Sequence, residues 1–115
     1  MDIERLREYC IGLDIAVEET FPFGNDTLVF KINQKIFALM GLDNNPLSIN
    51  LKCDPEIAIE YRESYSSIQP GYHMNKKHWN TVVLEGEIDD SFLKKMIKDS
   101  FDLVAKAKKT RVKTD

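Results

Sequence analysis

The chain has 115 residues, a mass of 13.3 kDa and a formal net charge of −3 at pH 7. This length fits one domain with a core that needs no metal or disulfide cross-link, and no apolar run is long enough to span a membrane. No secretory signal opens the sequence, so we expect a cytoplasmic protein. The negative charge argues against strong non-specific attraction to nucleic acid, but the basic residues gather in three blocks, 31–53, 70–84 and 91–115.

The first segment is predicted to form a helix. Asp2 can cap it, and Ile3, Leu6 and Cys10 recur at helical spacing. Gly12 supplies a stop signal. The apolar stripe indicates a helix that packs on the core.

Three strands are predicted next. Residues 27–32 and 35–41 alternate with a period of two and are separated only by Asn33 and Gln34, which indicates a hairpin. Apolar and polar side chains alternate cleanly over residues 47–53. The sheet should therefore have one solvent-exposed face.

A second helix is predicted to start at Asp54 and Pro55, because proline fits the first turn and a carboxylate favours the helix N-terminus. Its expected buried stripe comprises Ile57, Ala58, Tyr61 and Tyr65. A last helix should be capped by Asp89 or Asp90 and fray from Lys106. The order helix, three strands, helix, one or two strands, helix predicts an α+β fold with an antiparallel sheet packed against helices.

A basic loop precedes the last predicted strand. The stretch from Pro70 to Leu84 contains two histidines, two lysines and the only tryptophan, and no acidic residue. Because tryptophan buries a large area, we predict that Trp79 is a core anchor and that His78 and Asn80 point outward. Loops on rigid scaffolds often carry function, so this loop is the best candidate for a working surface.

Several stretches together resemble the MmcQ/YjbR family of small bacterial proteins. They are FPFG (21–24), LVFKI (28–32), KIFALM (35–40), LKCDPE (51–56), PGYHMNKKHWNTV (70–82) and SFDLV (100–104). The resemblance implies a CyaY-like (frataxin-like), double-wing α+β fold over residues 1–115, and DNA binding. The Asn33–Gln34 turn departs from the glycine-rich turn that such proteins often carry.

The leading hypothesis is a nucleic-acid-binding module that contacts phosphates through lysines of the sheet and loop. Lys31, Lys35 and Lys52 are expected to project from a shared sheet surface, and loop side chains would add hydrogen bonds. The candidate residues are Lys31, Lys35, Lys52, His73, Asn75, Lys76, Lys77 and His78.

Three other functional classes are alternatives to this hypothesis: an adaptor, a metal-binding protein and an enzyme. A protein-interaction or small-anion adaptor could use the same loop, with Tyr72 and Phe23 as apolar contacts. The spacing of Cys10, Cys53 and the two histidines matches no close-paired zinc pattern, and the acids of the first helix alternate with arginines, which weakens an iron site. A Cys53 nucleophile lacks a local signature. We expect no enzyme, no metal, no cofactor, no disulfide and a monomer.

Overall fold

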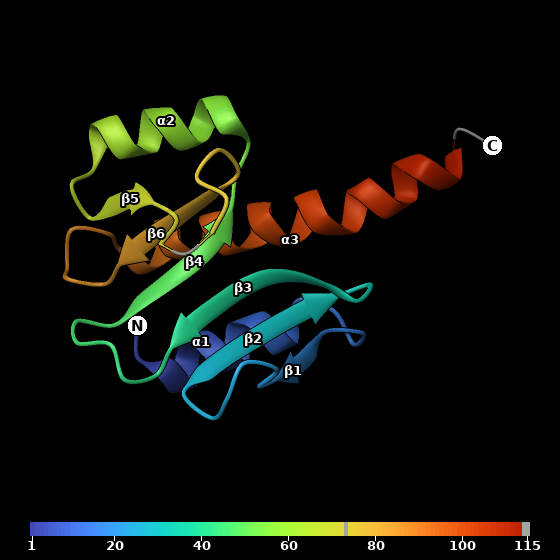
Figure 1. The fold of residues 1–115 in the computed structure, drawn as a ribbon, viewed down its shortest axis with the longest axis horizontal. Coiled ribbons are helices and arrows are strands. Elements are labelled where there is room, and N and C mark those ends of the chain that lie inside the picture. The colour runs from blue at the N-terminus through green and yellow to red at the C-terminus, as the bar shows by residue number, and fades with distance from the viewer. Residues whose placement is uncertain (73, 114–115) are drawn as a thin grey trace.

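The computed structural model describes residues 1–72 and 74–113, with side chains as far as Lys106. Its order is helix, four strands, helix, two strands, helix (Figure 1). The elements are α1 (Ile3–Gly12), β1 (Glu18–Thr20), β2 (Thr27–Ile32), β3 (Lys35–Gly41), β4 (Ser48–Lys52), α2 (Pro55–Ser64), β5 (Ile68–Pro70), β6 (Trp79–Val83) and α3 (Asp90–Lys113). The predicted α+β class is confirmed, with β1 as an additional strand.

The six strands form one antiparallel sheet in the order β1-β2-β3-β4-β6-β5. The three helices lie on the same face of this sheet. Leu6 of α1 and Ile97 of α3 belong to the core cluster that this face buries, and Figure 1 shows both helices behind the strands. Tyr61 of α2 packs edge-to-face on Phe92 of α3, with ring centroids 5.3 Å apart.

The opposite side of the sheet carries no helix among the described residues, and we call it the open face. Directly paired residues of antiparallel strands point to the same side, so the register defines this face. Its central members are Val29, Lys31, Leu39, Asn50, Lys52, Gln69, Trp79 and Thr81.

Local sequence signals set the helix starts. Asp2 accepts a hydrogen bond from the Arg5 amide at 2.9 Å, and Asp89 accepts one from the Phe92 amide at 2.8 Å. Asp54 caps α2 through two first-turn amides. Each carboxylate satisfies backbone donors that have no partner within the helix. The predicted caps are confirmed.

The predicted hairpin is also confirmed. Asn33 and Gln34 both adopt positive φ values, 53° and 68°, which is the geometry of a tight two-residue turn. Ile32 and Lys35 pair directly beside the turn. The absence of glycine at the turn therefore changes neither its length nor its register.

The core is centred on aromatic rings next to a β-bulge. Phe30 pairs with Ala38 and Lys31 pairs with Ile36, so Phe37 is an extra residue on β3. Phe37 is fully buried. Its ring packs edge-to-face on Phe101 of α3 at 5.3 Å. The bulge thus turns a large side chain into the helix-covered core.

Ser100 of α3 bridges two strands where they separate. β3 and β4 pair at Ala38–Leu51 and Leu39–Asn50, and Figure 1 shows them diverging beyond that point. The fully buried Ser100 hydroxyl donates to the Phe37 carbonyl and accepts from the Lys52 amide at 2.9 Å. It supplies the hydrogen bonds that the diverging backbones cannot make to each other.

Two local expectations are wrong, and one strand is not predicted. The Ile57 side chain is 41% exposed and does not join the buried stripe of α2, whereas Ala58 is fully buried. Helix α3 does not fray from Lys106 but continues to Lys113. The strand β1, for which the sequence predicts no element, pairs along β2 through Glu18, Glu19 and Thr20. No helix among the described residues combines the length and apolarity needed to cross a membrane.

Candidate nucleic-acid interface

Two of the three predicted sheet lysines share the open face. Lys52 pairs with Trp79, and Lys31 pairs with Ile36 on the same side of the sheet. Lys35 pairs with Ile32, a core residue of the opposite face. The expectation that Lys35 shares a surface with Lys31 is therefore wrong, because a two-residue turn places Lys35 opposite Ile32.

The loop between β5 and β6 is held close to the sheet. The Gly71 amide donates to the Trp79 carbonyl at 2.9 Å. A Cβ atom on Gly71 would lie 2.8 Å from the Trp79 Cβ, so only glycine permits this approach without a shift. At the other end of the loop the Asn75 carbonyl accepts from the amides of His78 and Trp79, at 3.3 and 3.0 Å. Backbone hydrogen bonds therefore hold both ends of the loop.

The predicted loop residues differ in whether their side chains already form hydrogen bonds within the protein. The Asn75 side-chain oxygen accepts from the Lys77 amide at 2.9 Å, so it serves the turn. The Lys76 ammonium donates to the Gly71 carbonyl at 3.0 Å. Lys77 is exposed, and His78 is partly buried. His73, also predicted, lies outside the described residues.

Trp79 and Asn80 have the reverse of their predicted environments. Asn80 is 3% exposed and lies on the helix side, where its amide nitrogen donates to the Ala58 carbonyl at 3.4 Å. Trp79 alternates to the open face, where it is partly exposed. The prediction of a core tryptophan with an outward Asn80 is wrong, because α2 covers the position of Asn80.

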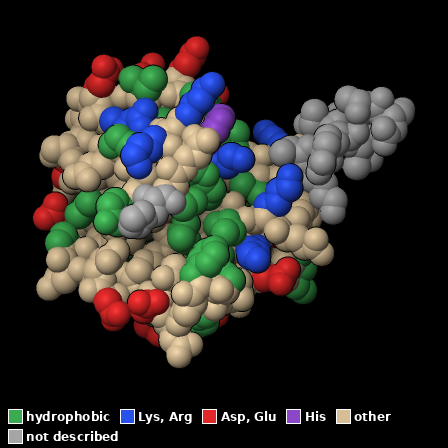
Figure 2. Space-filling view, in the orientation of Figure 1, with side chains coloured by type: hydrophobic (Ala, Val, Ile, Leu, Met, Phe, Trp, Pro, Cys, Tyr) green, Lys and Arg blue, Asp and Glu red, His purple; other side chains and the backbone are tan. Residues whose placement is uncertain are grey.

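The charges on this face differ from those on α3. Lys95 and Lys98 of α3 each form an ion pair with the aspartate four residues on, at 2.7 Å. Within the described part of the chain, no carboxylate lies within 4 Å of Lys31, Lys52 or Lys77. Figure 2 shows lysine and arginine side chains around the upper and right parts of this face, beside a band of hydrophobic side chains, with acidic ones mainly at the periphery.

Glu18 is an acidic neighbour of Lys31 and could weaken anion binding there. It pairs with Lys31 across β1 and β2 and is exposed. None of the ion pairs among the described residues joins these two side chains. We therefore expect Lys31 to contribute less to anion binding than Lys52, whose cross-strand neighbour is Trp79.

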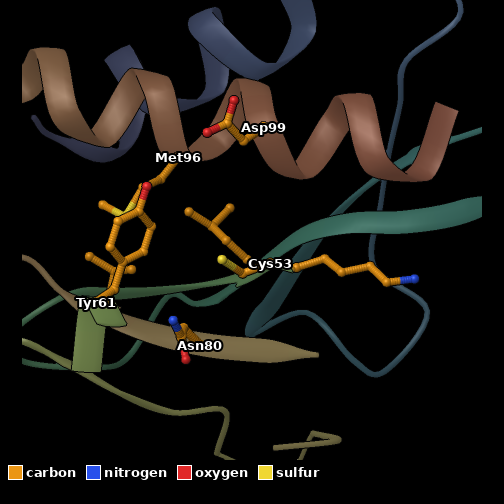
Figure 3. A pocket seen from close by; sticks show the side chains of 8 residues that line it. Cys53, Tyr61, Asn80, Met96 and Asp99 are labelled. Carbon is orange, nitrogen blue, oxygen red and sulfur yellow. The ribbon is translucent and has the colours of Figure 1, made fainter. Parts of the chain in front are cut away.

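A small cavity lies between α2, α3 and the sheet. Its walls include Cys53, Tyr61 and Met96, with Asn80 and Asp99 as polar members, and Figure 3 shows how these side chains surround it. Its volume is about 20 Å³, roughly the space of one water molecule. It is too small for an organic substrate.

The cysteines do not suit nucleophilic or metal chemistry. Burial is the main cause that raises the pKa of the Cys53 thiol to about 11, and Asp54 and Asp99 add to it. Burial raises the pKa of Cys10 to about 12. With these pKa values both thiols are protonated at neutral pH. The described residues also contain no group of three or more His, Cys, Asp or Glu side chains placed to hold a metal.

We expect the cysteines to react slowly with a disulfide reagent such as DTNB. A pKa of about 11 instead of 9 lowers the thiolate fraction of Cys53 about 100-fold below pH 9. The fully buried Cys10 should react only on unfolding. Absorbance of released thionitrobenzoate at pH 8, with and without urea, measures both rates. A Cys53→Ser variant assigns them, and a native Cys53 as fast as in urea would contradict this prediction.

Comparison with known proteins places the chain in a family. The family model YjbR matches residues 15–103. The chain is 45% identical to YbdF of Escherichia coli O157:H7, covering 90% of this chain and 88% of that protein. It is 31% identical to YjbR of Escherichia coli K12, covering 88% and 85%.

Solved structures agree with this assignment. A Deinococcus radiodurans protein with a DUF419 domain superposes with a TM-score of 0.86 at 41% identity, covering 90% of this chain and 78% of that one. A Pseudomonas syringae protein superposes with a TM-score of 0.78 at 30% identity, covering 90% and 99%. The match of sequence and fold over nearly the whole length shows that the chain belongs to the YjbR family.

Proposed function

We propose that this protein is a non-enzymatic DNA-binding module whose interface is the open face and the β5–β6 loop. One observation carries the proposal: Lys31 and Lys52 lie on the side of the sheet that no described helix covers, Lys77 is exposed in the β5–β6 loop, and none of the three is within 4 Å of a described carboxylate. The lysines of α3 that form ion pairs are already neutralised by their own helix. Unpaired ammonium groups on a free face are suited to phosphates.

The number of these lysines limits the affinity. About three phosphate contacts predict that the logarithm of the binding constant falls with the logarithm of salt concentration with a slope of about −3 on duplex DNA. The Lys76 ammonium adds less, because it already donates to Gly71. The net charge of −3 opposes association at long range. Binding should therefore be weak and strongly salt-dependent.

Charge reversal on the open face tests the proposal. We expect the double change Lys52→Glu and Lys77→Glu to weaken binding at least tenfold at low salt, because each change removes a phosphate contact and adds a repulsion. Fluorescence anisotropy with labelled oligonucleotides at two salt concentrations measures the effect.

A matched control separates the face from the overall charge. Lys35→Glu with Lys94→Glu changes the net charge equally, but Lys35 belongs to the helix side and Lys94 lies over the Tyr9 ring of α1. Binding by this pair should stay within about threefold of the unaltered protein, because its changes act only at long range. Equal losses in both pairs would refute the interface, and no binding by the unaltered protein at low salt would refute the function.

A protein or small-anion adaptor is the second candidate. The observation that favours it is the exposure of Phe21 and Phe23, 45% and 63%, in the β1–β2 loop. The expected use of Phe23 together with Tyr72 is not supported, since their loops join the strand pairs at opposite edges of the sheet, four strand spacings or roughly 19 Å apart from centre to centre. A thermal-shift experiment with hexaglutamate, in which the peptide stabilises the protein and DNA does not, would favour this candidate.

A further inference from the structure

We infer that the open face binds unpaired bases, so that its nucleic acid is single-stranded. This inference rests on the proposed function and names the class of nucleic acid. It starts from Tyr72, the first residue after Gly71 in the loop, whose side chain is 70% exposed. An exposed aromatic ring beside a basic surface is a stacking platform for bases.

A backbone hydrogen bond attaches Tyr72 to the sheet. The Tyr72 amide donates to the Thr81 hydroxyl at 3.0 Å. Thr81 lies on the open face of β6, and its hydroxyl donates to the Asn50 side-chain oxygen on β4. The backbone of Tyr72 is therefore attached to the open face at Thr81.

Two amide side chains flank this attachment. The row across the sheet runs Asn50, Thr81, Gln69, with direct pairing on both sides of Thr81. The Asn50 oxygen is occupied by Thr81, which leaves its amide nitrogen as a donor; Gln69 is exposed and offers a donor and an acceptor. Neither side chain makes another hydrogen bond to a described residue. Amides of this kind recognise the edges of bases.

A cation lies next to the row. Lys52 is two residues beyond Asn50 on the same side of β4, about 7 Å along the strand. The part-exposed Trp79 is its cross-strand neighbour. Lys52 could thus contact a phosphate of a strand whose base stacks on Tyr72. In a duplex the bases are stacked and paired, so neither the ring nor the amides could reach their faces and Watson–Crick edges.

The experiment compares three labelled probes of equal length on the full chain at low salt: single-stranded DNA, duplex DNA, and an abasic strand that keeps its phosphates. We expect the single strand to bind at least tenfold more tightly than the other two. Tyr72→Ala should weaken single-strand binding roughly 5- to 150-fold, because stacking is lost, and leave duplex and abasic binding unchanged.

Two variants serve as controls. Tyr72→Phe keeps the ring and should bind like the unaltered protein. Phe23→Ala removes an exposed ring at the other edge of the sheet and should also bind normally. Equal affinity for single strand and duplex, or no effect of Tyr72→Ala, overturns the inference. In that case a loss on reversal of Lys52 and Lys77 still supports the proposed function, whereas failure of all three probes to bind refutes both.

Discussion

Replacing Phe37 by alanine is expected to lower the free energy of unfolding by about 3–5 kcal/mol. The side chain is fully buried, and its ring contacts Phe101 of α3 and Phe30 of β2, with centroids 5.3 and 6.4 Å away. The loss is a large part of the roughly 5–15 kcal/mol that stabilises a domain of this size.

Urea unfolding followed by far-ultraviolet circular dichroism measures this change. Phe37→Leu should cost less, about 1 kcal/mol, because most of the volume is kept. Phe23→Ala, at an exposed ring, should change stability by less than about 0.5 kcal/mol. A loss below 1 kcal/mol for Phe37→Ala would show that the core closes around the missing ring.

Ser100→Ala is expected to cost about 2–4 kcal/mol, a large effect for the loss of one oxygen atom. The hydroxyl is fully buried and serves the Phe37 carbonyl and the Lys52 amide together. Alanine leaves both backbone groups without a partner. An unsatisfied buried group costs about 1–3 kcal/mol, and the cost for the Lys52 amide lies at the lower end because it is only partly buried. The cost arises because β3 and β4 have already separated there and cannot pair with each other.

The same unfolding assay tests this prediction, and hydrogen exchange adds a local reading. Ser91→Ala, at an exposed serine of the same helix, should have little effect. The Lys52 amide should exchange faster in Ser100→Ala than in the unaltered protein. Unchanged exchange would mean that another group replaces the hydroxyl.

Much of the fold could be predicted because its signals are local. Asp2, Asp54 and Asp89 stand immediately before apolar helical stripes, and each one caps a helix. The alternation over β4 places Ile49 and Leu51 in the core. Such patterns depend on a few neighbouring residues and need no knowledge of the partner element.

The missed features depend on the partner. The β1 sequence, EET, carries no strand alternation and becomes a strand only because β2 offers a free edge. Trp79 and Asn80 alternate as a strand requires, but α2 decides which face is buried. For Lys35 a signal was available: a two-residue turn pairs the residues that flank it, which assigns Lys35 to the side of Ile32.

For the candidate site, the sequence indicated the lysines of sheet and loop but not Asn50 and Gln69. Both are ordinary polar strand residues, and only the cross-strand register places them on either side of Thr81. Tyr72 was considered as an apolar contact. Its attachment to this row depends on a hydrogen bond between loop and strand, which spacing along the chain does not encode.

The two outer strands constrain how a partner can approach. β1 and β5 have three residues each, and β5 ends at Pro70, which has no amide hydrogen to donate. Addition of a strand from another chain needs a longer free edge with regularly spaced backbone groups. The sheet is thus protected against growth by edge-to-edge pairing, and recognition is left to the side chains that project from its surface.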